Sequence, residues 1–130
     1  MTTNKLNRSI TAVALGLCAL AAGCGTARDV DAYRSDTERL LQTRSNQVKS
    51  CYDQALQTDR KLAGTVAVSF VVEKDSGVIS KATIDQAKTT APPTLGQCVL
   101  HAVEGLKLDP GDRNEGHATF VYDFKPTPAS

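Results

Sequence analysis

Two stretches in which apolar and polar residues alternate place the strongest constraint on how this chain can fold. Gly64 to Glu73 and Glu115 to Phe124 both alternate with a period of two, which is typical of strands with one buried face. The predicted buried side chains are Val66, Val68, Phe70 and Val72 in the first strand, and Ala118, Phe120, Tyr122 and Phe124 in the last. Each strand therefore needs a sheet with a covered and an open face.

A third strand is predicted from Val78 to Asp85, as the return arm of a hairpin. The loop between the two arms reads Lys74-Asp75-Ser76-Gly77, and a glycine there can take the positive φ that tight turns need. We expect Val78, Ala82 and Ile84 to lie on the buried face of this strand.

Two helical regions flank the strands. The first lies between Asp29, a suitable N-cap, and Gln57, where the chain has neither glycine nor proline. Its more polar first part, Tyr33 to Ser45, is expected to form a helical stalk or a frayed segment. The second helix is predicted from Thr94 to Leu106. The predicted buried stripes are Leu41, Val48, Cys51, Tyr52, Ala55 and Leu56 in the first region, and Leu95, Cys98, Val99, Ala102, Val103 and Leu106 in the second.

The element order α-β-β-α-β predicts an α+β domain, in which a three-stranded antiparallel sheet carries two helices on one face. A chain of 130 residues suits one such domain. The formal charge of +1 disfavours a nucleic-acid partner, because a nucleic-acid binder needs a basic face to neutralise phosphates.

The N-terminal segment has the pattern of a secretory signal. Lys5 and Arg8 precede an apolar run, Ile10 to Leu20, which is too short to cross a bilayer. The following Leu20-Ala21-Ala22-Gly23-Cys24 resembles a bacterial lipobox. The alternatives are an ordinary cleaved signal and a buried N-terminal helix.

The lipobox resemblance implies that residues 1–23 are removed and that Cys24 carries diacylglycerol, with a further acyl chain such as palmitate on the new N-terminus. Three acyl chains anchor a protein firmly, whereas one chain binds only marginally. Gly25 instead of Asp after the cysteine favours the outer membrane, facing the periplasm. The mature chain loses two basic residues and no acidic residue, so its formal charge becomes −1. We expect no cofactor apart from this covalent lipid.

Two cysteines of the mature chain remain after the lipid site. Cys51 and Cys98 lie on the predicted buried stripes of the two helices, and thiols in an oxidising compartment tend to pair. A Cys51–Cys98 disulfide is therefore predicted, and two buried free thiols are the alternative. A redox-active pair is disfavoured, because the sequence lacks Cys-x-x-Cys spacing. Cys18 lies in the segment expected to be removed.

Four segments together resemble the AgmX/PglI-type C-terminal domain, a TonB-like domain of myxobacterial envelope proteins. They are Cys51-Tyr52-Asp53-Gln54-Ala55-Leu56, the strand beginning Gly64-Thr65-Val66, the hairpin Ser76-Gly77-Val78-Ile79 and the helix Cys98-Val99-Leu100-His101-Ala102-Val103. The resemblance covers residues 46–125, after a lipidated N-terminus and stalk at 24–45 and before a proline-containing tail at 126–130. Leu106 and Leu108 stand where the family usually has aromatic residues. A TonB transducer also has an uncleaved membrane helix and a long proline-rich spacer, and this sequence shows neither.

The sequence shows no pattern typical of an enzyme. His101 and His117 are predicted on solvated faces, away from any nucleophile, triad or metal-binding pattern. The acidic residues between Asp109 and Glu115 lack the regular spacing of a calcium loop. We therefore expect neither catalysis nor a metal, nor a small-molecule substrate.

The resemblance instead implies an interaction module in an envelope complex for transport, motility or secretion. TonB-like domains as a family bind a partner peptide as an added strand, here at the last strand, with Thr119, Val121 and Asp123 as the predicted contact residues. Against this, Asp123, Lys125 and Pro126 could block pairing along that edge. The alternative is a structural lipoprotein that contacts its partners through the N-terminal helix.

Overall fold

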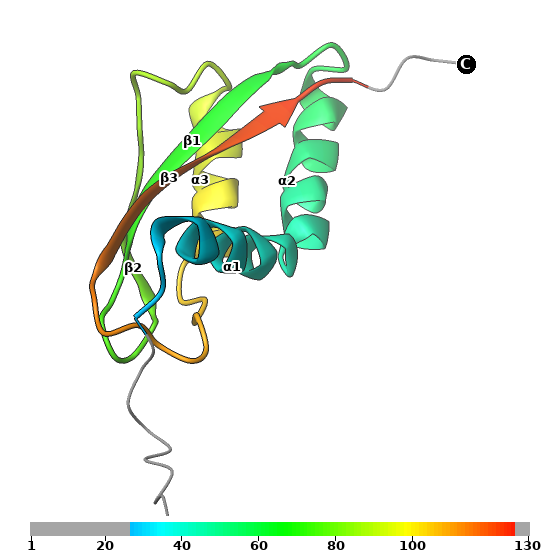
Figure 1. The fold of residues 1–130 in the computed structure, drawn as a ribbon. Helices are drawn as coiled ribbons and strands as arrows, with labels where there is room; N and C mark the ends of the chain where they lie inside the picture. The colour runs from blue at the N-terminus through cyan, green and yellow to red at the C-terminus, as the bar shows by residue number, and fades with distance from the viewer. Residues whose placement is uncertain (1–26, 127–130) are drawn as a thin grey trace, which may run out of the picture.

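A computed structural model describes residues 27–126 of the chain as a sheet with helices packed on one of its faces (Figure 1). The elements are α1 (Val30–Gln42), α2 (Ser45–Thr58), β1 (Gly64–Val72), β2 (Ile79–Ile84), α3 (Pro93–Val103) and β3 (Gly116–Phe124). The predicted α+β class with a three-stranded antiparallel sheet is confirmed. Cys24, the lipobox and the end of the tail lie outside the described residues.

The strand order in the sheet is β2-β1-β3, so the apolar strand β1 lies at the centre. β1 and β3 pair along their whole length without a shift in register, from Gly64 opposite Phe124 to Val72 opposite Gly116. β2 is shorter and pairs with the other side of β1. Both β2 and β3 are therefore edge strands.

The predicted inward face of β2 is wrong at Val78, because the strand contains a bulge. The register shifts between Ser69 and Val71 of β1, and the extra residue falls on β2, where Lys81 takes a φ of 51°. Because of the extra residue, the inward and outward positions are exchanged in the part of β2 before the bulge. Ile79 is therefore buried in place of Val78, on the same face as Ala82.

The predicted stalk is instead a separate helix that packs on the domain. The chain turns at Thr43 and Arg44, where the Thr43 hydroxyl donates a 2.6 Å hydrogen bond to the carbonyl oxygen of Leu40. Thr37 and Leu41 of α1 are buried. The helix is polar overall, but this narrow buried stripe is enough to hold it against the core.

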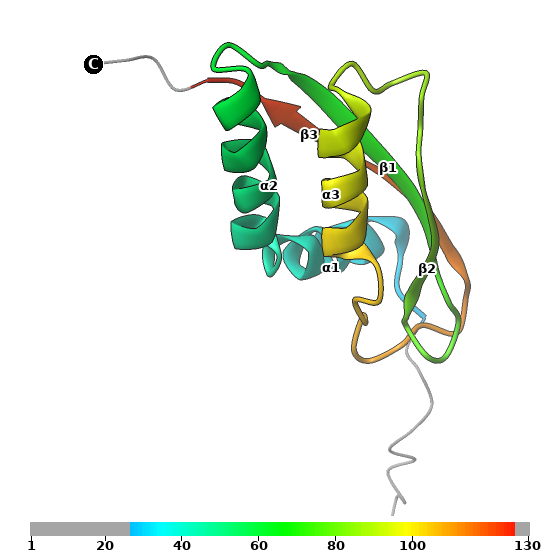
Figure 2. The same cartoon turned by 180° about the vertical axis from the view of Figure 1, so that it is seen from behind.

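The two remaining helices lie side by side on one face of the sheet (Figure 2). α3 begins at Pro93 rather than Thr94, because proline is well suited to the first turn, where its missing N–H is not needed. It ends at Val103, before Gly105 with its φ of 74°, and Leu106 is buried after the helix rather than within it. Leu106 and Leu108 both lie in the core.

The predicted disulfide between the two packed helices is confirmed. Cys51 of α2 and Cys98 of α3 are joined, with their Cα atoms 5.8 Å apart.

None of the helices between residues 27 and 126 has the length and apolar character that crossing a membrane requires.

Candidate functional site

The backbone of β3 presents unpaired hydrogen-bonding groups along one side. In an antiparallel strand each residue directs both its N–H and its C=O to the same side, and the side alternates. Thr65 and Ala67 of β1 direct these groups away from β3, since the amides of Thr90 and Asp85 donate to their respective carbonyl oxygens. Their partners on β3, Asp123 and Val121, must therefore direct their own groups away from β1.

The same alternation assigns His117 and Thr119 to the free edge, since they pair with Val71 and Ser69. The predicted contact residues Thr119, Val121 and Asp123 thus share one edge, and their side chains are exposed on the open face of the sheet. The Thr119 hydroxyl lies 2.7 Å from that of Ser69, and Val121 is 46% exposed. This edge extends over nine residues, or about 30 Å at 3.3 Å per residue.

The opposite edge of the sheet is protected. β2 has six residues and carries a bulge at a lysine, and both features discourage strand pairing. The loop after β2 then covers the rest of β1: Thr89 Oγ1 accepts from the Ala67 amide at 3.0 Å, and Thr90 Oγ1 accepts from the Thr65 amide at 2.8 Å. Only β3 combines length, regular register and an uncovered edge among the strands between residues 27 and 126.

The inner face of β3 carries a row of aromatic side chains beside this edge, of which Phe120 and Tyr122 are half-buried and Phe124 is buried. The ring of Tyr122 lies 4.9 Å from that of Phe120 and 6.3 Å from that of Phe124. Tyr52 of α2 stacks obliquely on Phe124 at 5.0 Å and donates a hydrogen bond to the carbonyl oxygen of Leu62. Burial raises the pKa of Tyr122 to about 12, so this hydroxyl stays neutral.

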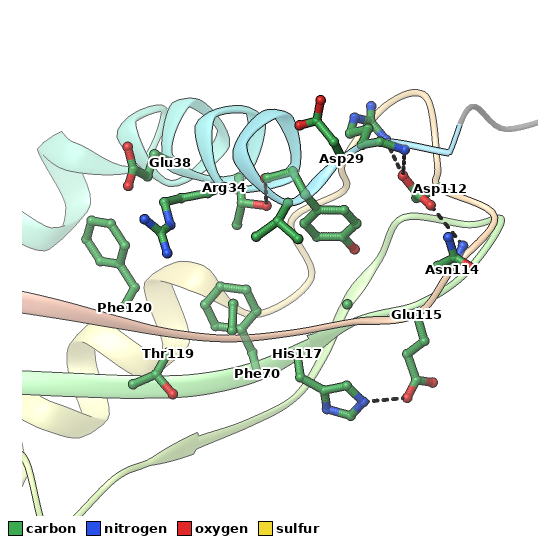
Figure 3. Close-up of a pocket in the computed structure, with 16 residues that line it drawn as sticks. Asp29, Arg34, Glu38, Phe70, Asp112, Asn114, Glu115, His117, Thr119 and Phe120 are labelled. Atoms are coloured by element: carbon green, nitrogen blue, oxygen red, sulfur yellow. Dashed lines mark hydrogen bonds and ion pairs between the residues drawn. The ribbon is translucent and has the colours of Figure 1, made fainter.

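A groove of about 520 Å³ separates α1 from the first half of β3 (Figure 3). The wall that α1 forms is lined by Tyr33, Arg34, Thr37 and Glu38. The side that the sheet forms is lined by Phe70, Ala118 and Phe120. In Figure 3 the guanidinium of Arg34 extends from α1 toward the side of the groove where Phe120 lies. His117 points to the opposite face of β3, where its Nε2 lies 2.9 Å from Glu115.

Tyr33 lines this groove and packs against β3. A Cβ added at Gly116 would collide with the Tyr33 ring and its hydroxyl, so the phenol lies directly on the backbone of β3. That hydroxyl has no hydrogen-bond partner among the described residues. Burial and the negative charge of Asp112 raise the pKa of Tyr33.

A buried ion pair fixes the start of α1 beside the groove. Arg28 donates from its amide to Asp112 Oδ2 at 2.8 Å, from Nε to Asp36 Oδ2 at 2.8 Å and from Nη2 to the carbonyl oxygen of Pro110 at 2.8 Å. The Asp112 side chain is fully buried. Burial acts to raise its pKa, but the amides of Asn114 and Arg28 and the Arg28 charge outweigh it, so the pKa is lowered.

Sequence reasoning missed this cluster. The turn Asp109-Pro110-Gly111-Asp112 folds back on the β1–β2 hairpin, where the Asp112 carbonyl oxygen accepts from the Asp75 amide, and the Asp112 side chain is buried. Asp29 does cap α1 as predicted, accepting from the Ala32 amide at 2.7 Å. No local pattern links Arg28 to Asp112, or Tyr33 to Gly116, because each pair is more than 80 residues apart.

Both histidines lie on the surface. His101 and His117 are exposed, and each has a glutamate as its near neighbour. Among residues 27–126 there is no group of three or more histidine, cysteine, aspartate or glutamate side chains placed to hold a metal ion.

Comparison with known proteins finds a solved structure that is similar to this chain. The NMR solution structure of the TonB C-terminal domain of Helicobacter pylori is similar, with a TM-score of 0.48 and 17% sequence identity, over 64% of this chain and 80% of that chain. No protein-family model matches the chain, and no curated protein matches it. The AgmX/PglI-type resemblance therefore stays a prediction.

Proposed function

We propose that this protein is a non-catalytic, lipid-anchored component of a bacterial cell envelope that binds a partner protein by adding a strand to the free edge of β3. The observation that carries the proposal is the contrast between the two edges of the sheet. β3 offers about 30 Å of unpaired backbone, whereas β2 is short, bulged and followed by a covering loop. An extended peptide can satisfy such an edge through main-chain hydrogen bonds.

The groove beside β3 gives this edge a means of selecting its partner. Side chains of an added strand alternate between the two faces of the sheet. Those on the inner face would lie next to Ala118 and Phe120 and extend under α1, toward Tyr33. The aromatic surroundings favour apolar side chains at these positions of the partner, spaced two residues apart.

The envelope location rests on the lipobox-like sequence before Cys24, together with the Cys51–Cys98 disulfide, which is typical of proteins from oxidising compartments. We propose the outer membrane, facing the periplasm, because Gly25 follows the lipidated cysteine. The test of the anchor is Cys24→Ser: we expect loss of acylated mass and release from the membrane fraction, and unchanged fractionation would contradict the anchor.

The alternative, contact through the N-terminal helix, has less support. α1 is not a free stalk, because Tyr33, Leu40 and Leu41 pack against the core, although Val30 at its first residue is exposed. Its outward residues, such as Asp31 and Arg39, have mixed charge and offer no continuous apolar surface.

Photo-crosslinking in cells distinguishes the two routes. The full-length protein would carry p-benzoylphenylalanine in place of Thr119 on β3, Thr83 on β2 or Arg39 on α1. Thr119 and Thr83 are matched sites, because both pair with Ser69 from opposite sides of β1. Strand addition at β3 predicts a crosslinked product from the Thr119 position and none from Thr83. A product from Arg39 alone would favour the helix route.

A backbone variant then tests the hydrogen bonding itself. Val121→Pro removes an N–H that points away from β1, so β1–β3 pairing should survive while partner binding is lost. Val121→Ala is the matched control, because it shortens the side chain and keeps the N–H. We expect the crosslink from Thr119 to disappear with proline and persist with alanine. Equal crosslinking in both variants would contradict strand addition.

A further inference from the structure

The described part of the chain begins and ends at opposite ends of the domain (Figures 1 and 2). It begins next to the β1–β2 hairpin and the loop between α3 and β3, which we call the hairpin end. It ends after β3, next to the C-terminus of α2 and the loop that follows it, which we call the far end. β3 runs from the hairpin end at Gly116 to the far end at Phe124.

The first residues that the structure describes are tightly held at the hairpin end. Arg28 contacts Asp112 through both its backbone amide and its guanidinium, and its side chain is only 8% exposed. A buried arginine with this many partners does not detach readily, because separating the pair would leave the buried charge of Asp112 without a partner. The position at which the chain enters the domain is therefore fixed.

The hairpin end is itself a rigid unit. The Asp75 amide donates to the Asp112 carbonyl oxygen at 2.6 Å, and the Leu108 amide donates to the Gly77 carbonyl oxygen at 2.7 Å. A Cβ at Gly77 would collide with the Leu108 backbone, and one at Gly111 would collide with that of Asp75. The hairpin and the loop before β3 consequently move together with Arg28.

Only three residues separate Cys24 from Arg28 in the sequence. Whatever conformation they adopt, four residue steps span at most about 14 Å. This limit is about half the length of β3, which is about 30 Å. A lipid on Cys24 therefore cannot be far from the hairpin end.

We propose that the hairpin end of the domain faces the bilayer that carries the lipid of Cys24, and that the far end extends away from it. This inference rests on the lipid anchor proposed above. It makes the surface around the hairpin residue Lys74 and the loop residues Lys107 and Asp109 a membrane-facing surface, and it leaves the later half of the β3 edge directed toward partners away from that bilayer.

The charges at the hairpin end indicate that the tether, rather than electrostatic attraction, imposes this contact. Basic and acidic side chains are mixed there, and they nearly cancel. The exposed ones are Glu73, Lys74, Asp75, Lys107, Asp109, Arg113 and Glu115. A surface of this kind has no net attraction for anionic lipid headgroups, which favour clusters of lysine and arginine.

Spin-label EPR on the lipidated protein in vesicles tests the orientation. One label is attached through Lys74→Cys at the hairpin end, and another through Arg60→Cys at the far end; both positions are exposed. Cys51 and Cys98 are already bonded to each other, so the introduced thiol is available for labelling. With nickel chelated to lipid headgroups, we expect severalfold stronger relaxation of the label at position 74 than of the label at position 60.

Lengthening the tether is the matched control. A 20-residue Gly-Ser insertion after Ala27 spans roughly 25 Å on average, so the difference between the two labels should largely disappear. Equal relaxation of the two labels with the natural tether, or no change after the insertion, would overturn the proposal. Acylated mass and co-flotation with vesicles are measured first, so failure of the lipid anchor is recognised separately.

The unlipidated protein tests the role of the tether. We expect Cys24→Ser protein to remain unbound to vesicles of mixed zwitterionic and anionic lipid. Binding of this variant through the hairpin end would show that the surface attracts the membrane by itself, and would overturn the conclusion that the tether imposes the contact.

Discussion

The phenol of Tyr33 lies directly on the backbone of Gly116, where any side chain would collide with it. This contact joins α1 to the first residue of β3, and both residues line the groove beside the free edge. A contact between residues so far apart in sequence turns a polar helix into one wall of the proposed binding site.

We expect Gly116→Ala to destabilise the protein, although alanine is ordinarily preferred to glycine in a strand. The added Cβ must displace the Tyr33 ring, and overpacking of this kind typically costs about 1–3 kcal/mol. Urea unfolding measures the change. Combining Gly116→Ala with Tyr33→Ala should recover part of the loss, since the colliding ring is gone. Simple additivity of the two single changes would show that the contact does not couple them.

The Cys51–Cys98 disulfide should supply a large share of the stability. It closes a loop with a sequence separation of 47, which corresponds to about 4 kcal/mol in the chain-entropy treatment. We expect the Cys51→Ser, Cys98→Ser double variant to lose about 2–4 kcal/mol of unfolding free energy. Wild-type protein measured under reducing conditions is the control, and it should show a similar loss. A loss that appears in the variant but not on reduction would point to altered packing instead.

The Arg28–Asp112 pair should make stability fall in acid. The pKa of Asp112 is lower in the folded protein than in the unfolded chain, where an aspartate titrates near about 3.9. The contribution of this carboxylate to the free energy of unfolding is therefore complete above the unfolded-state pKa, and it is lost as the pH falls through the lower folded-state pKa. We expect Asp112→Asn to be clearly less stable than wild type at neutral pH.

The pH dependence of that difference is the sharper measurement. Denaturation curves at a series of pH values give the free energy of unfolding of each protein. The difference in this free energy between wild type and Asp112→Asn should become smaller below about pH 4. Asp53→Asn is a suitable control, because its exposed pair with Lys49 on α2 should contribute little. A gap that stays constant to low pH would mean that the carboxylate charge of Asp112 is not what stabilises the fold.

Filling the groove should weaken partner binding without closing the β3 edge. Ala118→Leu places extra bulk on the inner face, where side chains of an added strand would enter, and it leaves every outward N–H of β3 in place. We expect at least a tenfold drop in crosslinking yield from a probe at position 121, with the protein still folded by circular dichroism. Thr83→Leu adds similar bulk on the open face of β2, away from the proposed binding edge, and should retain most of the yield. Equal losses in the two variants would argue against a role for the groove.

The sequence by itself determined the elements that depend on local periodicity. The alternation in β1 and β3, the turn at Gly77 and the apolar stripe that places Cys51 and Cys98 on inward helix faces are all regular patterns of neighbouring residues, and the structure agrees with them. Helix ends were less well predicted, because the turn at Thr43 has neither glycine nor proline to mark it.

Tertiary structure alone decided the parts that join distant residues. A one-residue bulge at Lys81 changed which residue is buried at the start of β2, and periodicity cannot locate such an insertion. The burial of Asp112 depends on Arg28, and the position of α1 depends on the small volume of Gly116 under Tyr33. These contacts have no local signature, since their free energy arises only when the chain has already brought its first helix to its last strand.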